Sequence, residues 1–368
     1  MKNTFGSSVA ITLFGESHGS AIGAVLDGMA PGIAVDESFI AHQMDLRRSV
    51  SSLSTARKEA DKVQLLSGIK DGVTTGTPIT FMIQNSDTHS KDYEALRTVA
   101  RPGHADYTAY CKYHGFSDTR GGGHFSGRIT AGIVAAGAVA ITALNNIGIF
   151  IGTHIAKCAG VSDRKFENYE NDIKLLSDMP LAVLDDEAAE KIKTEIEKAK
   201  ADGDSVGGIL ETAVIGLPAG VGEPWFDTLE SVLAHGMFAI PAVKGVEFGE
   251  GFGFSDMRGS KANDAFRMDR GGIVTETNHN GGILGGISNG MPILFRTAIK
   301  PTPSIYKAQN TVDFSKNENT ELIIHGRHDP AIVHRARVVV DSITALILCD
   351  LLALRYGTDY LRNGGSDK

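Results

Sequence analysis

The chain has 368 residues, of which 42% are hydrophobic and 22% charged, and its formal net charge is −8. This composition is typical of a globular protein with a large core, and the negative charge argues against a general binder of nucleic acid or acidic membranes. Three widely spaced cysteines, an N-terminus unlike a signal peptide and the absence of an apolar run of about 18 residues favour a cytoplasmic protein without disulfides.

The first half of the chain predicts strands followed by a buried helix. A helix is expected over 36–48, with Asp36 as its N-cap. A second helix, over 129–146, is apolar on nearly all sides, so we expect it to be buried between two layers. The strands of this half are expected over 9–14, 21–27, 63–69 and 78–84.

The second half predicts further layers around this core. Residues 157–205 are highly charged and indicate a surface excursion with an amphipathic helix near 185–200. Residues 359–368 are expected to be a frayed, flexible tail. No Pro- or Ser-rich linker divides the chain, so a single domain over 1–368 is favoured. The remaining expected elements are helices over 227–237 and 331–354 and strands over 209–215, 243–248, 291–298 and 321–324.

Two histidines lie in glycine-framed loops. His18 follows Ser17 in Gly-Glu-Ser-His-Gly at 15–19, and His104 follows Arg101 by three residues in Arg-Pro-Gly-His-Ala-Asp-Tyr-Thr at 101–108. Imidazole donates and accepts protons near neutral pH, and glycine lets a ligand approach the backbone closely. Both histidines are therefore candidate acid–base groups.

The segment 120–128, Arg-Gly-Gly-Gly-His-Phe-Ser-Gly-Arg, leads directly into the helix at 129. Free N–H groups at a helix start favour phosphate or carboxylate, and Arg120, Ser126 and Arg128 could add hydrogen bonds to such an anion. The alternative is a glycine turn that only caps a buried helix.

A third cluster, His-Gly-Arg-His-Asp-Pro at 325–330, is followed by Arg335 and Arg337. Two histidines and Asp329 could suggest a metal site, but the neighbouring arginines favour an anion over a divalent cation. Asp329 could act as a base or orient one.

Arg47 and Arg48 end the helix expected over 36–48. They could bind an anion, or they could lie on a solvated face and complement the helix dipole.

The usual nucleotide and hydrolase motifs are absent from the sequence, which has no Walker, Rossmann or nucleophile-elbow pattern. Glycine-rich stretches at 270–286 and a Lys-Pro-Thr-Pro-Ser run at 300–304 indicate loops that wrap a ligand, although tight hairpins would use the same residues. The residues together predict a site for a multiply anionic small molecule, with proton transfer coupled to loss of an anionic group.

Five of these motifs occur in the order seen in the chorismate synthase family, which the chain resembles from about residue 5 to about residue 352. They are Gly-Glu-Ser-His-Gly, Arg-Pro-Gly-His-Ala-Asp-Tyr-Thr, Gly-Gly-Gly, Gly-Gly-Ile-Leu-Gly-Gly-Ile-Ser and Gly-Arg-His-Asp-Pro. The resemblance implies a fold of central helices sandwiched between antiparallel β-sheets. It also implies the last step of the shikimate pathway: 1,4-anti elimination of phosphate from 5-enolpyruvylshikimate 3-phosphate to give chorismate, dependent on reduced FMN.

The resemblance also implies roles for individual residues. His18, with Ser17 beside it, would protonate the departing phosphate. His104 would act on the protonation state of the reduced flavin, and Asp329 would assist deprotonation through flavin N5. The substrate contacts would be Arg47, Arg48, Arg101, Ser126, Arg128 and Arg327. The flavin contacts would be His124, Phe125, Ser126, Ala242, Gly285, Lys300, Pro301, Thr302, Pro303, Ser304 and Arg327.

The chain departs from the commoner family pattern at a few positions. His124-Phe125 replaces Arg-Ser after the three glycines, Ser49-Val50 replaces Pro-Gly, and Pro241 stands where asparagine is common. The resemblance further implies a homotetramer. We expect no metal site, because of the arginines that surround the 325–330 cluster. Because no nicotinamide fingerprint is present, we expect the flavin to be reduced externally, with NADPH involved only indirectly. The competing hypotheses are a flavin-dependent oxidoreductase acting on an anionic metabolite and a protein that only binds such a metabolite.

Overall fold

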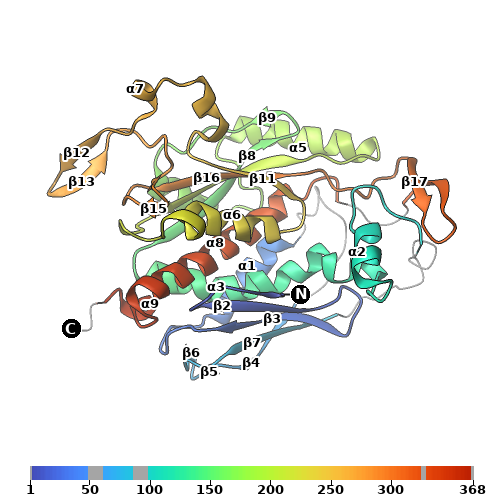
Figure 1. Ribbon diagram of the computed structural model, residues 1–368, viewed down its shortest axis with the longest axis horizontal. Coiled ribbons are helices and arrows are strands. Elements are labelled where there is room, and N and C mark those ends of the chain that lie inside the picture. Colours follow the sequence, from blue (N-terminus) through green and yellow to red (C-terminus); the bar gives the residue numbers. More distant parts are fainter. Residues whose placement is uncertain (1, 49–60, 86–97, 325–328, 366–368) are drawn as a thin grey trace.

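The computed structural model describes residues 2–48, 61–85, 98–324 and 329–365. Two five-stranded antiparallel sheets enclose a layer of helices (Figure 1). The first sheet has the order β1 (Thr4–Phe5), β2 (Ala10–Gly15), β3 (Ala21–Asp27), β7 (Ile79–Gln84), β4 (Val63–Ser67). The second has the order β11 (Val243–Phe248), β16 (Ile293–Ile299), β10 (Gly208–Ile215), β8 (Phe150–Cys158), β9 (Val161–Ser162). The expected sandwich is confirmed.

The helical layer is formed by four helices, of which α3 and α8 are the most deeply buried. A Cβ atom on Gly137 of α3 would lie 2.3 Å from Cβ of Ser342 in α8, so glycine is required for the two helices to pack this closely. The four helices are α1 (Glu37–Arg47), α3 (Thr130–Asn146), α6 (Leu229–Ala239) and α8 (Val333–Tyr356).

The expectation that the chain has no apolar run of about 18 residues is wrong for residues 127–146, which are long and apolar enough to cross a membrane by length and composition. However, 83% of this stretch's 18-residue apolar window is buried inside the protein. This pattern is that of a central core helix, as the all-round apolar sequence predicted.

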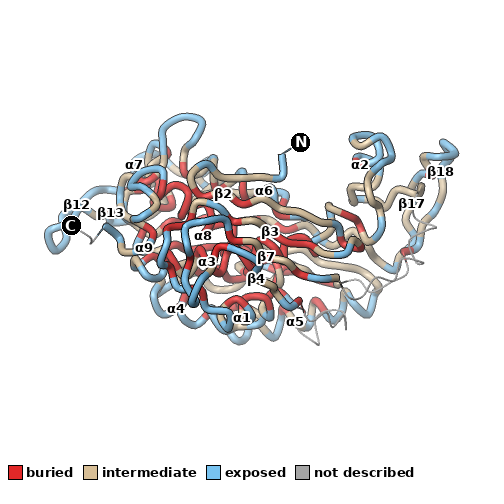
Figure 2. The backbone as a smooth tube through the Cα atoms, turned by 90° about the horizontal axis from the view of Figure 1, so that it is seen from below, coloured by how far each residue is buried: buried red, intermediate tan, exposed pale blue. Residues whose placement is uncertain are grey.

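Smaller elements extend from the sandwich. Figure 2 shows buried residues concentrated in its middle and exposed residues at the projecting hairpins. The two-stranded units are β5 (Ile69–Lys70) with β6 (Val73–Thr74), β12 (Phe266–Asp269) with β13 (Gly272–Thr275), β14 (Ile283–Leu284) with β15 (Ile287–Ser288), and β17 (Gln309–Asp313) with β18 (Glu318–Leu322). The short helices are α2 (Asp106–Tyr113), α4 (Tyr169–Leu176), α7 (Gly259–Ala262) and α9 (Tyr360–Asn363), with 3-10 turns η2 (Arg120–Phe125), η3 (Gly127–Ile129), η4 (Trp225–Asp227) and η5 (Gly251–Asp256).

Residues 157–205 form a covering layer with one buried face. Its amphipathic helix α5 (Asp186–Ala201) inserts Ile192 and Ile196 into the main core and exposes a charged face.

The C-terminal segment 359–368 was expected to be a frayed tail. This is wrong for its first residues, because α9 is helical and the side chain of Leu361 is fully buried against the core.

The two most buried helices begin on the same side of the fold. Residues at the N-terminal ends of α3 and α8 line one large cavity. The N-terminal strands are held to α8 by Asp350, whose carboxylate accepts hydrogen bonds from the backbone N–H groups of Ser7, Ser8 and Val9. The β2–β3 register, which pairs Gly15 with Ile22, then places the first histidine loop at the end of this sheet.

Candidate active site

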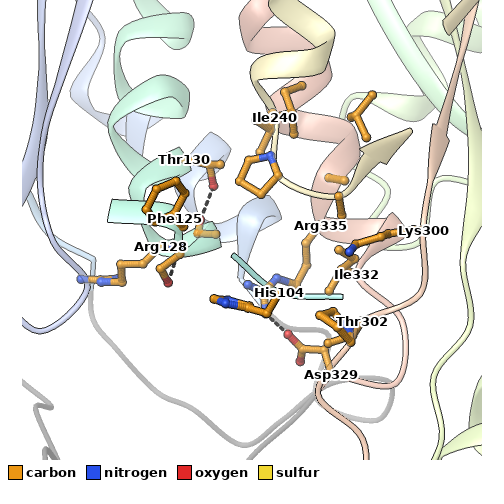
Figure 3. A pocket seen from close by; sticks show the side chains of 18 of the residues that line it. His104, Phe125, Arg128, Thr130, Ile240, Lys300, Thr302, Asp329, Ile332 and Arg335 are labelled. Carbon is orange, nitrogen blue, oxygen red and sulfur yellow. Dashed lines mark hydrogen bonds and ion pairs between the residues drawn. The ribbon is translucent and has the colours of Figure 1, made fainter. Parts of the chain in front are cut away.

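The cavity has a volume of about 670 Å³, a size typical of sites for small molecules and cofactors. In Figure 3, Phe125, Arg128 and Thr130 lie on one side and Lys300, Thr302 and Asp329 on the other. The predicted residues among those that line it are Arg47, Arg48, Arg101, His104, His124, Phe125, Ser126, Arg128, Ala242, Lys300, Thr302, Pro303, Ser304 and Asp329.

The charge of the cavity is strongly positive although the chain is acidic. Its described lining contains seven basic side chains, Arg47, Arg48, Arg101, Arg128, Lys244, Lys300 and Arg335, and two acidic ones, Asp61 and Asp329. The N-terminal ends of α3 and α8 add their partial positive charge. The cavity is therefore suited to a ligand with several negative groups.

The glycines of the 120–128 segment lie close to the two predicted histidines. Gly121, Gly122 and Gly123 all have positive φ, at 58°, 86° and 54°. A Cβ on Gly121 would lie 2.1 Å from Cε1 of His18, and one on Gly122 would lie 3.2 Å from Nε2 of His104. Each imidazole therefore lies close to a different glycine of the loop, His18 to Gly121 and His104 to Gly122.

The loop that carries Ser17 and His18 is fastened to this glycine loop. The backbone N–H of Ser17 donates to the carbonyl oxygen of Gly123 at 3.1 Å. His124 donates from Nδ1 to the carbonyl oxygen of Gly15 at 2.8 Å. Ser17 and His18 are buried beside Gly121, which itself lines the cavity, so both predicted residues belong to its wall region although neither is among its lining residues.

The remainder of the 120–128 segment shows features of both sequence interpretations. Ser126 does cap the following turn, since its hydroxyl accepts from the N–H of Arg128 at 3.3 Å. Ser126, Phe125 and His124 also line the cavity. Phe125 packs edge-on against Tyr113, with ring centroids 6.1 Å apart.

His104 lies in a compact group with Arg101 and Asp106. Nδ1 of His104 is 2.9 Å from Oδ1 of Asp106, and Arg101 binds both oxygens of the same carboxylate at 2.6 and 2.8 Å. Burial would raise the pKa of Asp106, but hydrogen bonds from Arg101 and His104 outweigh it and hold that pKa far below the usual range. Asp106 is therefore a charged anchor beside the histidine.

Arg47 and Arg128 share one buried carboxylate, that of Asp61. Nη1 of Arg47 is 3.1 Å from Oδ2 of Asp61, and Arg128 binds the other oxygen. Arg47 also donates from Nε to the hydroxyl of Thr130 at 3.1 Å. The interpretation of Arg47 as a solvated dipole complement is wrong, since it is 5% exposed, whereas Arg48 is more open and pairs with Asp45 at 2.6 Å.

The opposite wall combines apolar side chains with two lysines, Lys244 and Lys300. Residues 238–243 supply apolar surface, and Ala242 has a positive φ of 76°. Lys300 donates from Nζ to the carbonyl oxygen of Gly103, joining this wall to the His104 loop. Burial, and then the charge of Lys244, lower the pKa of the Lys300 ammonium. An apolar surface beside paired ammonium groups fits a flat cofactor that carries phosphate.

Asp329 lies in the segment just before α8, which begins at Val333. Its Oδ2 is 2.5 Å from Nη1 of Arg335, which holds the carboxylate at the cavity wall. Arg327 lies outside the described residues, as do Ser49-Val50 and the histidines of the 325–328 segment. Within the described ranges, no group of three or more His, Cys, Asp or Glu could hold a metal ion.

Two predicted contacts do not line the cavity. Gly285 lies in the turn between β14 and β15 and is exposed. Pro301 does not line the cavity, although its neighbours Lys300 and Thr302 do. Conversely, three lining or supporting residues received no predicted role: Asp61, Asp106 and Lys244. Arg335 was predicted only as part of an anion-binding cluster, not as the partner of Asp329. Asp106 had a sequence signal, because it lies two residues after His104 in the same motif.

A large basic cavity with the imidazole of His104 and the carboxylate of Asp329 at its wall, and with the buried His18 beside Gly121, is typical of an enzyme that moves protons on an anionic small molecule. The family model described as chorismate synthase matches residues 9–353. The chain belongs to the chorismate synthase family, whose members are carbon–oxygen lyases of the shikimate pathway.

Similar proteins cover nearly the whole chain. The chorismate synthase of Pyrococcus abyssi is 47% identical over 350 residues, which is 95% of this chain and 97% of that protein. That of Dehalococcoides mccartyi is 47% identical over 358 residues, or 97% of this chain and 98% of that protein. A crystal structure of chorismate synthase superposes with a TM-score of 0.76 at 28% identity, covering 96% of this chain and 94% of that one.

Proposed function

We propose that the protein eliminates phosphate from 5-enolpyruvylshikimate 3-phosphate to form chorismate, and that the basic cavity between α3 and α8 is where it does so. The observation that carries this proposal is the placement of seven cationic side chains around a cavity bordered by two imidazoles. The substrate has two carboxylates and one phosphate, so the charge of the cavity complements it.

His18 is the proposed acid for the leaving group. Its imidazole is buried against Gly121, which lines the basic cavity that is proposed to hold the phosphate. Protonating a departing phosphate oxygen lowers its basicity and so assists C–O cleavage. Ser17, also buried in this loop, is proposed to assist by fixing the position of His18.

Asp329 and His104 are the proposed groups for the remaining protons. The reaction removes a hydrogen from C6 of the substrate, and Asp329 places a carboxylate at the cavity wall, where Arg335 binds its Oδ2. His104 would exchange a proton at Nε2, the nitrogen that lies beside Gly122 of the glycine loop. These roles require both groups within reach of the bound ligands.

The substrate anions are proposed to bind to Arg48, Arg101, Arg128 and the undescribed Arg327, with Ser126 adding a hydroxyl. Arg47 is proposed to contribute mainly by holding the start of α3, since its guanidinium donates to Thr130 and to the carbonyl oxygens of Gly127 and Arg128. This arrangement keeps the other cations in place before the ligand arrives.

Reduced FMN is the proposed cofactor, and its chemistry when bound is to lend an electron during C–O cleavage and recover it as the C6 hydrogen leaves. The wall formed by residues 238–243 and the 300–304 segment fits it, because apolar surface lies beside Lys244 and Lys300. His124 and Phe125 would contact it from the glycine loop. We further propose a cytoplasmic homotetramer that receives reduced flavin from an external reductant.

The test is an anaerobic incubation of the protein with chemically reduced FMN and 5-enolpyruvylshikimate 3-phosphate. We expect one phosphate and one chorismate per substrate consumed, with the flavin still reduced at the end. Net oxidation of the substrate would instead identify a flavin-dependent oxidoreductase. Ligand binding without any product from folded protein would identify a binding protein.

A further inference from the structure

We propose that Asp106, held by Arg101, is a positioning residue that fixes the tautomer and orientation of His104. In this arrangement Nδ1 of His104 carries a proton, and Nε2 lies on the other edge of the ring, beside Gly122. The assignment of Nδ1 rests on the apoprotein geometry alone. Only the catalytic use of Nε2 rests on the proposed function.

The proton on Nδ1 follows from the groups around it. Nδ1 is 2.9 Å from Oδ1 of Asp106 and 3.1 Å from Nη2 of Arg101. A carboxylate oxygen can only accept a hydrogen bond and a guanidinium can only donate one. An unprotonated Nδ1 would set its lone pair against a carboxylate at the shorter of the two distances. A protonated Nδ1 donates a hydrogen bond to Asp106, and the N–H groups of Arg101 donate to the same carboxylate.

Arg101 makes the carboxylate a rigid acceptor. Its Nε and Nη2 bind the two oxygens of Asp106 at 2.8 and 2.6 Å, and its backbone N–H adds a third bond at 2.9 Å. The side chains of Arg101 and Asp106 are only 9% and 10% exposed. A bidentate pair shielded from solvent holds the Asp106 carboxylate in one orientation. The lone pair of Oδ1 that Arg101 leaves available then sets the direction from which Nδ1 of His104 can donate, and so orients the imidazole ring.

The other edge of the ring faces the glycine loop. A Cβ placed on Gly122 would lie 3.2 Å from both Cε1 and Nε2 of His104, and Gly122 has a φ of 86°. Glycine is therefore needed here both for the backbone conformation and for the approach of the ring. The imidazole is held between Asp106 at Nδ1 and Gly122 at the Nε2 edge, with 20% of its side chain left exposed.

This geometry has a direct chemical consequence. With Nδ1 protonated, Nε2 of the neutral ring is the nitrogen that can accept a proton from a ligand in the cavity. Asp106 would then stabilise the imidazolium without taking the proton itself, as the carboxylate does in a Ser-His-Asp triad. Arg101, expected from the resemblance to bind substrate, thus has a second task as the partner of Asp106.

The test uses the full-length apoprotein with ¹⁵N-labelled histidine, at about pH 8.5, where imidazole is ordinarily neutral. Long-range ¹H–¹⁵N correlations distinguish the two tautomers, and His104→Gln assigns the signal. We expect wild type to show Nδ1–H. In Asp106→Asn, Arg101 would bind the amide oxygen, the amide nitrogen would face Nδ1, and the tautomer would switch to Nε2–H. Asp106→Glu, which keeps the carboxylate, should retain Nδ1–H.

His154 provides an internal control, since its Nδ1 faces a different carboxylate, Asp163, at 2.7 Å, and its signal should be the same in all variants.

In turnover assays Asp106→Asn should lower kcat on the order of 100-fold with a smaller change in KM, and Asp106→Glu should recover part of it. An Nε2–H tautomer in wild type, or an unchanged tautomer in a folded Asp106→Asn, would overturn the proposal. If Asp106→Asn does not fold, the wild-type and Asp106→Glu tautomers still decide it. Absence of chorismate from wild type with the expected tautomers would reject the proposed function and leave this assignment standing.

Discussion

The imidazole of His18 lies directly against the α-carbon of Gly121, so closely that a Cβ atom on Gly121 would come within 2.2 Å of Nδ1. Replacing Gly121 by alanine should therefore displace His18 and also strain a backbone with φ of 58°. We expect kcat to fall on the order of 100-fold, the range lost when a general acid is misplaced.

Gly127→Ala is the matched control for this substitution. Gly127 belongs to the same segment, but an added Cβ there meets nothing within 4 Å. We expect nearly wild-type turnover and thermal unfolding. Equal activity in Gly121→Ala and Gly127→Ala would show that His18 is not needed at its observed position.

Asp61 joins two arginines of the cavity and should matter for both stability and substrate binding. Asp61→Asn removes the carboxylate between Arg47 and Arg128 and leaves two buried positive charges near each other. We expect the free energy of unfolding to fall by about 3 kcal/mol and KM to rise. Denaturant unfolding and initial-rate kinetics measure the two effects.

The control for Asp61 is Asp45→Asn, which removes the exposed partner of Arg48. An exposed pair of this kind contributes less than about 1 kcal/mol, so stability should change little. Comparable stability of the two variants would contradict the assigned importance of Asp61.

His154 predicts a specific dependence of stability on pH. It is fully buried between Asp163 and Glu211; burial lowers its pKa, but the hydrogen bonds with these two carboxylates outweigh burial and raise it. A raised folded-state pKa contributes stability that is present below the unfolded value of about 6.5 and is lost as pH rises through the folded-state value.

His154→Gln should therefore be less stable than wild type by about 3 kcal/mol below about pH 6.5, and this difference should shrink as pH increases. Unfolding by denaturant at a series of pH values measures it. His235→Gln, at an exposed histidine, should give a difference that does not vary in this way. A gap between wild type and His154→Gln that widens with pH would contradict the assignment.

Lys300 should contribute to FMN affinity, because it lies with Lys244 beside the apolar wall of the cavity. Lys300→Met keeps an unbranched side chain only one atom shorter and removes its charge. We expect the dissociation constant for FMN, followed by flavin fluorescence, to rise about tenfold, which corresponds to about 1.4 kcal/mol. Lys191→Met, on the exposed face of α5, is the control and should bind FMN like wild type. An unchanged affinity in Lys300→Met would place the flavin elsewhere.

Local patterns in the sequence predicted the long helices and most strands of the two main sheets, but few of the short helices and two-stranded hairpins. The cap at Asp36 is confirmed, since its carboxylate accepts from the N–H groups of Ser38 and Phe39. Strand β11 agrees with its predicted bounds of 243–248. Strand β8 was missed, because its central residues are buried on both faces and so show no alternation of apolar and polar side chains. The strand expected over 321–324 is wrong in its bounds, since β18 covers Glu318–Leu322.

The candidate site was predictable where its chemistry lies within one segment. His18 and His104 were recognisable from their glycine neighbours. The role of Asp61 was not, because its partners Arg47 and Arg128 are 14 and 67 positions away and meet it only after α1 and α3 pack together. Likewise, no local pattern shows that Lys244 and Lys300 face one cavity, or that His124 bonds to the backbone of Gly15.

The most direct test of the proposed mechanism compares wild type with His18→Ala under anaerobic conditions with reduced FMN and 5-enolpyruvylshikimate 3-phosphate. Wild type should release phosphate and chorismate in equal amounts. His18→Ala should still bind FMN and substrate but turn over at least about 100-fold more slowly. Equal rates for the two proteins, or no chorismate from folded wild type, would contradict a phosphate-eliminating site built around His18.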